Sequence, residues 1–149
     1  MDYSEKSTGE RMECEDIGKM PRRGTKGSCG YDIYLPHDVK LSRWKWTFID
    51  LKVRMEEGDI PSWHFGMIVP RSSSGVKHGH RLRNTCGIID SDYTMDTIKA
   101  MVKTDDWIPR TYREGERVLQ MIIVPYSRIA GEITPKNERT GGHGSTGKN

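Results

Sequence analysis

The feature that most constrains this chain is a segment in which apolar and charged side chains alternate. From Ile49 to Met55 every second residue is apolar, and the residues between them are Asp50, Lys52 and Arg54. Successive side chains of a strand point to opposite faces, so a period of two indicates a strand with one buried face. The segment therefore predicts one strand of a sheet that covers a core.

Further segments repeat this signal. Residues 31–35 alternate, and we expect Asp32 to be an isolated carboxylate on the outward face of that strand. Residues 65–69 and 119–124 are short apolar runs that end before a proline, which predicts buried strands. Residues 94–103 fit either a helix or a strand, and the neighbouring short strands favour a strand. Together these segments predict an all-β barrel or sandwich.

Composition limits the class of protein. A length of 149 residues suits one domain, but 34% hydrophobic and 30% charged residues make a modest core that a partner subunit would complete. The net charge of +3 is too small to indicate nucleic-acid binding. Three cysteines without paired spacing predict free thiols, and no apolar run is long enough to cross a membrane. We therefore expect a soluble cytoplasmic protein that does not bind a membrane.

The two ends of the chain differ from its centre. Residues 1–20 are polar and lack periodicity, which predicts an N-terminal arm, and residues 21–126 form the predicted β-barrel core. Residues 127–149 are expected to form a flexible, Gly-rich C-terminal arm. Backbone N–H groups and hydroxyls near its end can bind a polyphosphate. The same composition is also typical of a disordered tail, so both interpretations stay open.

Two polar segments are candidates for chemistry. Residues 84–93 read N-T-C-G-I-I-D-S-D-Y, and the D-S-D sequence favours a tight hairpin turn that carries Asp90 and Tyr93. Residues 70–75 read P-R-S-S-S-G, where Arg71 and the hydroxyls can bind phosphate. Each segment alone is also compatible with a solvated polar turn.

The order of such segments resembles the five motifs of the trimeric deoxyuridine triphosphatases (dUTPases) across about residues 18–147. The motifs are Gly30-Tyr31-Asp32, Pro70-Arg71-Ser72, Gly87 to Tyr93, Gly115-Glu116-Arg117 with Gln120, and Arg139 with Gly141 to Gly147. The resemblance implies a jelly-roll-like β barrel and a homotrimer whose sites are shared between subunits. It also implies hydrolysis of dUTP to dUMP and pyrophosphate by Mg²⁺-assisted water attack at the α-phosphate. That activity keeps uracil out of DNA and supplies dUMP for dTMP synthesis.

The resemblance assigns roles to particular residues. Asp90 is expected to orient and deprotonate the attacking water, and Asp32 to hold Mg²⁺ through water. Tyr93 is expected to pack under the deoxyribose and exclude ribonucleotides. The residues expected to bind the uracil are Asn84, Gly87, Ile89 and His143. The residues expected to bind the remainder of the substrate are Arg71, Ser72, Ser73, Gly75, Gln120, Arg139, Gly144, Ser145 and Thr146.

Two positions depart from the family pattern, and three alternatives remain. His143 stands where an aromatic side chain usually stacks on uracil, and Met95 stands where glycine is usual after the third motif. A dCTP deaminase shares the fold but needs a glutamate in the strand after that motif, and residues 97–102 contain none. A nucleotide-gated interaction protein is the second alternative. A nucleic-acid-binding barrel is disfavoured because no basic strand face carries aromatic residues, so direct nucleic-acid binding is not expected.

Overall fold

The structure is a computed structural model that describes residues 18–140 and forms a mostly β fold. Its largest sheet has five antiparallel strands. In spatial order these are β1 (Arg22–Arg23), β2 (Gly30–Tyr34), β10 (Arg117–Pro125), β5 (His64–Pro70) and β7 (Gly87–Asp90). The central strand β10 pairs with β2 on one side and β5 on the other, so it joins the two halves of the sheet.

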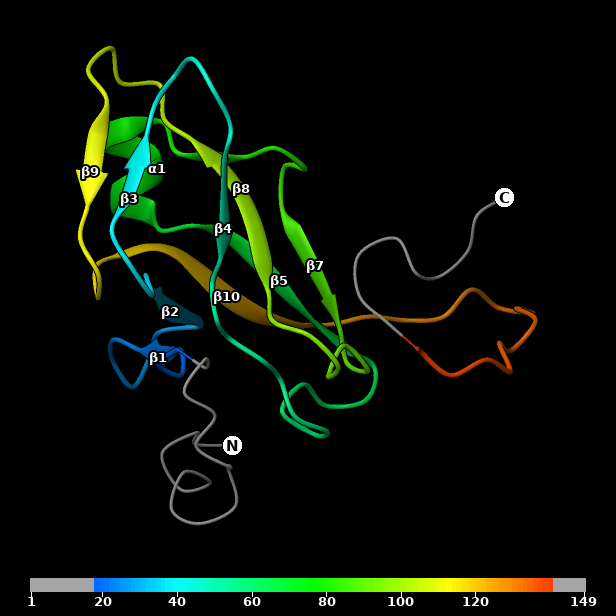
Figure 1. Cartoon of the computed structure of the whole chain (residues 1–149). Helices are drawn as coiled ribbons and strands as arrows, with labels where there is room; N and C mark the ends of the chain where they lie inside the picture. Colours follow the sequence, from blue (N-terminus) through cyan, green and yellow to red (C-terminus); the bar gives the residue numbers. More distant parts are fainter. Residues whose placement is uncertain (1–17, 141–149) are drawn as a thin grey trace.

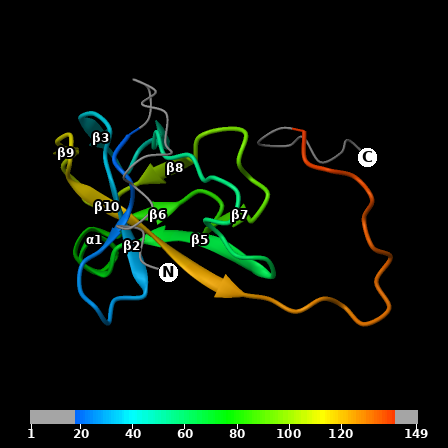
Figure 2. The same cartoon turned by 90° about the horizontal axis from the view of Figure 1, so that it is seen from below.

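Two smaller antiparallel sheets lie against the large one (Figures 1 and 2). One contains β4 (Thr47–Asp50), β8 (Lys99–Lys103) and β6 (Arg81–Leu82), and the other pairs β3 (Val39–Leu41) with β9 (Arg110–Tyr112). A short helix, α1 (Ser72–His78), follows β5 directly. This arrangement confirms the predicted all-β, jelly-roll-like fold.

The alternating pattern places the core where the sequence predicts it. Ile98, Ala100 and Val102 are 0%, 7% and 0% exposed, so residues 98–103 bury one face, and β8 confirms the strand interpretation. The apolar residues from Ile49 to Met55 are each 1% exposed. Burial of apolar area on this scale is the main stabilising term of such a fold.

The strand predicted over residues 49–55 is shorter than expected. β4 ends at Asp50, and Lys52 has a left-handed backbone with a φ of 56°. The chain remains attached to the sheet because the Leu51 N–H donates to the Ile98 carbonyl and the Ile98 N–H donates to the Val53 carbonyl. The backbone of Lys52 interrupts the regular ladder, whereas burial of alternate side chains continues to Met55.

Helix α1 is a feature that the sequence did not predict, since residues 70–75 were interpreted as a phosphate-binding segment or, alone, as a polar turn. Arg71 has an extended backbone at the N-cap, and Gly79 ends the helix with a left-handed φ of 59°. The Gly79 N–H donates to the carbonyl of Gly75, which satisfies one carbonyl at the end of the helix. Serine and glycine have low helix propensity, so the surrounding tertiary structure stabilises this helix against the local preference.

The D-S-D turn is present, but the predicted hairpin is wrong. The Tyr93 N–H donates to the Asp90 carbonyl at 3.0 Å and closes a turn after β7. However, β7 pairs with β5, whereas β8 pairs with β4 and β6. The turn therefore carries the chain from the large sheet to a smaller one, because the two flanking strands belong to different sheets.

The terminal regions are only partly described. Residues 1–17 lie outside the described part, and the Gly18 N–H donates to the Lys52 carbonyl at 2.6 Å. Residues 126–140 contain no helix or strand; they leave the barrel and loop back towards the end of β7 (Figure 1). The division into an N-terminal arm, a core and a C-terminal arm stays a prediction. Within residues 18–140, no helix has the length and apolar character needed to span a membrane.

Candidate functional site

Asp32 lies at the centre of a charged cluster on the large sheet. Its Oδ1 accepts a hydrogen bond from Arg71 Nε at 2.8 Å, and its Oδ2 accepts one from Arg117 Nη1 at 3.1 Å. The residue is 7% exposed, so the expectation of an isolated, outward-facing carboxylate is wrong. The reason is that two guanidinium groups from distant positions cover the side chain and compensate its desolvation.

Gln120 lies beside this cluster because β10 pairs Gln120 with Asp32 on β2. Its Nε2 donates to the Pro70 carbonyl at 3.2 Å, next to Arg71. A Cβ atom added at Gly30 would lie 2.0 Å from Gln120 Oε1. Glycine at position 30 therefore makes the room in which the Gln120 amide lies.

The predicted phosphate-binding serines follow Arg71. Ser72 and Ser73 begin α1 and are exposed, while the Gly75 N–H donates within the helix to the Arg71 carbonyl at 2.8 Å. Arg71 Nη1 also donates to the Arg117 carbonyl at 3.3 Å, which fixes the guanidinium between β2 and β10. Arg117 is thus part of the cluster although the sequence analysis placed it in a motif without assigning it a role. The signal in the sequence that could have indicated this role is a cationic side chain two residues after Gly115, a glycine typical of turns.

A cavity of about 420 Å³ opens between the large sheet and the sheet of β4, β8 and β6. Asn84 and Gly87, two of the predicted uracil-binding residues, line it. A Cβ atom on Gly87 would lie 3.0 Å from Ile68 Cβ, so a side chain at Gly87 would crowd the cavity wall. The full lining is Phe48, Ile68, Leu82, Arg83, Asn84, Gly87, Lys99, Ala100 and Met101.

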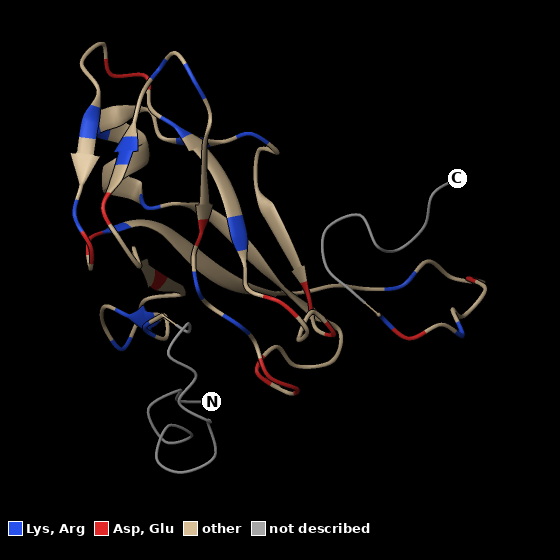
Figure 3. Cartoon of the chain, in the orientation of Figure 1, with Lys and Arg blue, Asp and Glu red and all other residues tan. Residues whose placement is uncertain are grey.

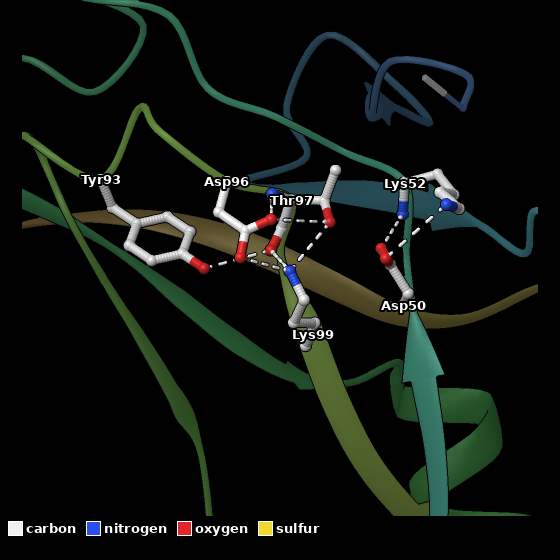
Figure 4. Close-up of polar contacts among 6 residues, drawn as sticks. All are labelled: Asp50, Lys52, Tyr93, Asp96, Thr97 and Lys99. Carbon is white, nitrogen blue, oxygen red and sulfur yellow. Dashed lines mark hydrogen bonds and ion pairs between the residues drawn. The ribbon is translucent and has the colours of Figure 1, made fainter. Parts of the chain in front are cut away.

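The remaining nucleoside residues lie at the end of β7. Ile89 is 4% exposed and packs in the core, so only its backbone is available to a base. Asp90 is exposed at the strand end. Tyr93 is 6% exposed and its hydroxyl donates to the Thr97 carbonyl at 3.1 Å (Figure 4). Burial raises the pKa of the Tyr93 phenol, so this ring is a neutral, fixed wall.

Lys99 stabilises the loop that follows Tyr93, as Figure 4 shows. Its Nζ donates to the Thr97 carbonyl at 2.9 Å and pairs with Asp96 Oδ2 at 2.7 Å. The hydrogen bond from Lys99 holds the pKa of the Asp96 carboxyl below its usual range. Lys99 also lines the cavity, so it places a cation close to the predicted nucleoside residues. The sequence alone did not indicate this role for Lys99.

Arg139 connects the C-terminal segment to the turn after β7. Its Nε donates to Asp92 Oδ1 at 2.8 Å and its Nη2 pairs with Asp90 Oδ2. The guanidinium carbon lies 5.8 Å from the centroid of the Tyr93 ring. Arg139 therefore lies beside the predicted catalytic carboxylate, while His143, Gly144, Ser145 and Thr146 lie outside the described residues.

Within one chain, the charged cluster and the Asp90 turn are far apart. Across the sheet, Asp32 pairs with Gln120 and Gln120 with Val69, whereas Asp90 pairs with Phe65 further along β5. Asp32 and Asp90 lie three strands apart across the sheet and four residues apart along the strand direction. At ordinary strand spacings this separation is about 20 Å. One chain thus separates the two groups of predicted residues.

The charged cluster suits a metal that arrives with a phosphate. No group of three or more potential metal ligands occurs within residues 18–140. Each Asp32 oxygen accepts one guanidinium hydrogen bond, and a carboxylate oxygen has a second lone pair for a metal-bound water. Mg²⁺ keeps several waters and takes phosphate oxygens, so an outer-sphere carboxylate fits it.

Comparisons with known proteins agree on one family. The dUTPase family model matches residues 16–147. The deoxyuridine 5′-triphosphate nucleotidohydrolase of Cutibacterium acnes is 32% identical over 86% of this chain and 85% of that protein. The same-named protein of Dictyoglomus turgidum is 30% identical over 92% and 98% of the two chains.

Solved structures show the same fold. The dUTPase from Streptococcus mutans aligns with a TM-score of 0.65 at 25% identity, covering 79% of this chain and 96% of that one. The dUTPase of phage phi11 of S. aureus aligns with a TM-score of 0.65 at 22% identity, covering 87% and 97%. At 22% identity, the likeness to the phage phi11 dUTPase shows a shared fold and no more.

Proposed function

This chain belongs to the dUTPase family and hydrolyses dUTP to dUMP and pyrophosphate, and we propose that each of its sites is assembled from several copies of the chain. The observation that carries the proposal is the strand pairing, which separates Asp32 from Asp90 by three strands and four residues within one chain, or about 20 Å at ordinary strand spacings. A deoxynucleoside triphosphate must contact the base pocket and the phosphate cluster at once. A homotrimer, in which a neighbour supplies the second group, meets this requirement.

Asp90 acts as the general base in the proposed reaction. Its exposed carboxylate holds a water molecule and accepts one of its protons as the water oxygen attacks the α-phosphorus. The bond between the α-phosphorus and the bridging oxygen breaks, and pyrophosphate leaves. Arg139 must release the Asp90 oxygen that it contacts in this structure before that oxygen can take the proton.

Arg71 and Gln120, with Ser72, Ser73 and Gly75 around the start of α1, hold the triphosphate. Asp32 orients Arg71 through the 2.8 Å contact, so the guanidinium is positioned before the substrate arrives. Asp32 would hold Mg²⁺ by accepting hydrogen bonds from its bound waters, and the metal would supply neutralisation of the phosphate charge. The Arg71 and Gln120 side chains and the donors at the start of α1 stabilise the negative charge that develops on the pyrophosphate leaving group.

Substrate selection follows from the nucleoside residues. Asn84 lines the cavity and offers an amide for the edge of uracil, with the Gly87–Ile89 backbone beside it. Backbone N–H and C=O groups cannot exchange donor and acceptor, so cytosine would leave some of them unpaired, and such a mismatch is strongly rejected. The buried, hydrogen-bonded Tyr93 ring has no freedom to move away from a ribose 2′-hydroxyl.

The C-terminal segment closes the site in this proposal. Arg139 turns from the carboxylates to the γ-phosphate, and Gly144, Ser145 and Thr146 bind phosphate while His143 stacks on uracil.

A cytoplasmic location is part of the proposal and rests on Cys29 and Cys86, which are free thiols as expected in a reducing compartment.

Nucleotide selectivity tests the assigned site. The purified protein with Mg²⁺ should release pyrophosphate from dUTP and barely act on UTP, dTTP or dCTP. Hydrolysis of UTP at a comparable rate would contradict the role of Tyr93. Ammonia release from dCTP would indicate a deaminase instead.

Subunit mixing tests whether sites are shared. Asp90→Asn and Arg71→Ala should each be inactive alone, since each lacks one half of every site. Refolded together in equal amounts, they should regain about a quarter of the wild-type activity, because that fraction of sites pairs an intact Asp90 with an intact Arg71 from another chain. Absence of any recovery, with mixed trimers present by mass spectrometry, would show that one chain supplies both residues.

A further inference from the structure

Two loops at the end of the barrel opposite Asp90 carry a cluster of tryptophans and cations that the hydrolase reaction does not use (Figure 1). We define this surface, the tip face, by its residues. They are Arg43, Trp44, Lys45 and Trp46 in the β3–β4 loop, Lys103 at the end of β8, and Trp107 and Ile108 in the β8–β9 loop. Trp44, Trp107 and Ile108 are 69%, 72% and 80% exposed, and such exposure is costly for large apolar side chains.

The rings of the tip face are held in place by cations. The Arg43 guanidinium carbon lies 3.8 Å from the Trp107 ring centroid and 5.4 Å from that of Trp44. The two indoles meet edge to face with their centroids 5.8 Å apart. Lys103 Nζ lies 4.8 Å from the centroid of Trp46. Because these contacts are already formed, a ligand would meet ordered rings and lose less entropy on binding.

The loop that carries Trp107 is also anchored. Thr104 Oγ1 donates to the His78 carbonyl at 2.7 Å, and the Asp105 N–H donates to the same carbonyl at 2.9 Å. Asp105 pairs with Arg81 and Asp106 pairs with Arg110, so the acidic residues of this loop are neutralised. Within residues 18–140, no carboxylate pairs with Arg43, Lys45 or Lys103. The tip face therefore presents uncompensated positive charge beside exposed rings (Figure 3 shows the charges along the chain).

We propose that the tip face binds single-stranded nucleic acid. The segment from Arg43 to Trp46 alternates cation and ring, which matches the alternation of phosphate and base along a strand. Exposed indoles provide stacking platforms for bases of any sequence, and the cations, which pair with no carboxylate of residues 18–140, attract the phosphates. These residues do not share one strand face but come together from two loops and the end of β8.

This chemistry favours a nucleic acid over a lipid surface. A membrane anchor buries a continuous apolar surface, while the strongly exposed apolar residues of the tip face are only Trp44, Trp107 and Ile108. Of the cations of the tip face, Arg43 and Lys103 lie over tryptophan rings instead of surrounding an apolar patch. The proposal needs only one chain and does not depend on the shared hydrolase site.

Fluorescence anisotropy with a labelled oligothymidylate of about 20 nucleotides tests the proposal, at about 50 mM salt and with excess dUMP to fill the nucleoside site. Trp44→Ala/Trp107→Ala should weaken binding at least about tenfold, since two stacking platforms are lost. Arg43→Gln/Lys45→Gln should weaken binding and flatten its dependence on salt. All variants should retain dUTP hydrolysis, which shows that they are folded.

Trp63→Ala is the matched control. Trp63 is 51% exposed and has the Arg128 guanidinium 4.4 Å from its ring centroid, but it precedes β5 at the other end of the barrel. Its removal should leave oligonucleotide binding unchanged. Equal binding by wild type and the double tryptophan variant would overturn the proposal, as would duplex DNA binding as tightly as the single strand. Binding to phosphatidylglycerol vesicles without binding to the oligonucleotide would identify a membrane surface and also overturn it.

Discussion

Arg71 Nε contacts Asp32 Oδ1 at 2.8 Å, between residues 39 positions apart in the chain. With Arg117 on the other oxygen, the three side chains carry one net positive charge. Such a cluster attracts phosphate and does not by itself attract a divalent cation. We expect Mg²⁺ to bind here only together with the nucleotide, because the phosphates bring the negative charge that the protein lacks here.

Calorimetric titration of Mg²⁺ into the nucleotide-free protein should therefore show no saturable binding. With a non-hydrolysable dUTP analogue present, Mg²⁺ should bind, and Asp32→Asn should weaken this binding because the asparagine has no charge to orient metal-bound water. Saturable Mg²⁺ binding without any nucleotide would contradict the prediction.

Asp90→Asn should lower turnover of dUTP by about 10²- to 10⁴-fold, because the amide cannot accept the proton of the attacking water. Binding of a non-hydrolysable analogue should persist. Asp92→Asn is the matched control, since it lies in the same turn and also contacts Arg139. That control should keep turnover within about tenfold of wild type in a pyrophosphate-release assay. Near-normal turnover of Asp90→Asn would exclude it as the base.

His80 should make stability depend on pH. The imidazole is 4% exposed, its Nε2 lies 2.9 Å from the Tyr112 hydroxyl, and burial followed by the charge of His78 lowers its pKa from 6.5 to about 4. The unfolded chain thus binds more protons between these values. The stabilisation is complete above pH 6.5 and is lost as the pH falls towards 4, by about 3 kcal/mol.

Urea unfolding between pH 7 and pH 4 measures this effect. His80→Gln retains a side chain that can bond Tyr112 but does not titrate, so its free energy of unfolding should change much less over the same range. The paired carboxylates Asp50 and Asp96 have pKa values below their usual range and lose stabilisation only at lower pH. An equally steep pH dependence in His80→Gln would assign the effect to other groups.

Gly30→Ala should destabilise the protein by about 1–3 kcal/mol, because the new methyl group would lie 2.0 Å from Gln120 Oε1. It should also raise KM for dUTP by displacing the Gln120 amide. The double variant Gly30→Ala/Gln120→Ala removes the clash and should regain stability without regaining substrate affinity. Additive losses of stability in the double variant would show that the two residues do not interact.

Truncation after Glu138 should reduce turnover at least about a hundredfold, because it removes Arg139 and the predicted phosphate-binding residues beyond it. The midpoint of thermal unfolding should change little, since Arg139 is not part of the core and pairs with the exposed carboxylates of Asp90 and Asp92. Arg139→Lys tests the guanidinium itself, and it should retain part of the activity because it keeps the charge without the bidentate geometry. Full activity of the truncated protein would show that the tail does not close the site.

The sequence by itself determined the mostly β class and the buried face of two segments. Alternation at residues 49–55 and 98–102 reports directly on burial, because side chains of an extended chain must point to opposite sides. The order of five motifs likewise determined the family without any coordinates. Local rules failed for α1, where three serines and a glycine form a helix that tertiary contacts stabilise.

Only the tertiary structure decided how the charged residues are paired and which groups one chain brings together. Asp32 finds partners 39 and 85 positions away, and Arg43 stacks on a ring from another loop. The strand pairing also separates Asp32 from Asp90, which was not visible in the motif order. Contacts of this range depend on sheet order and register, and these are settled by the packing of the whole core, not by neighbours in sequence.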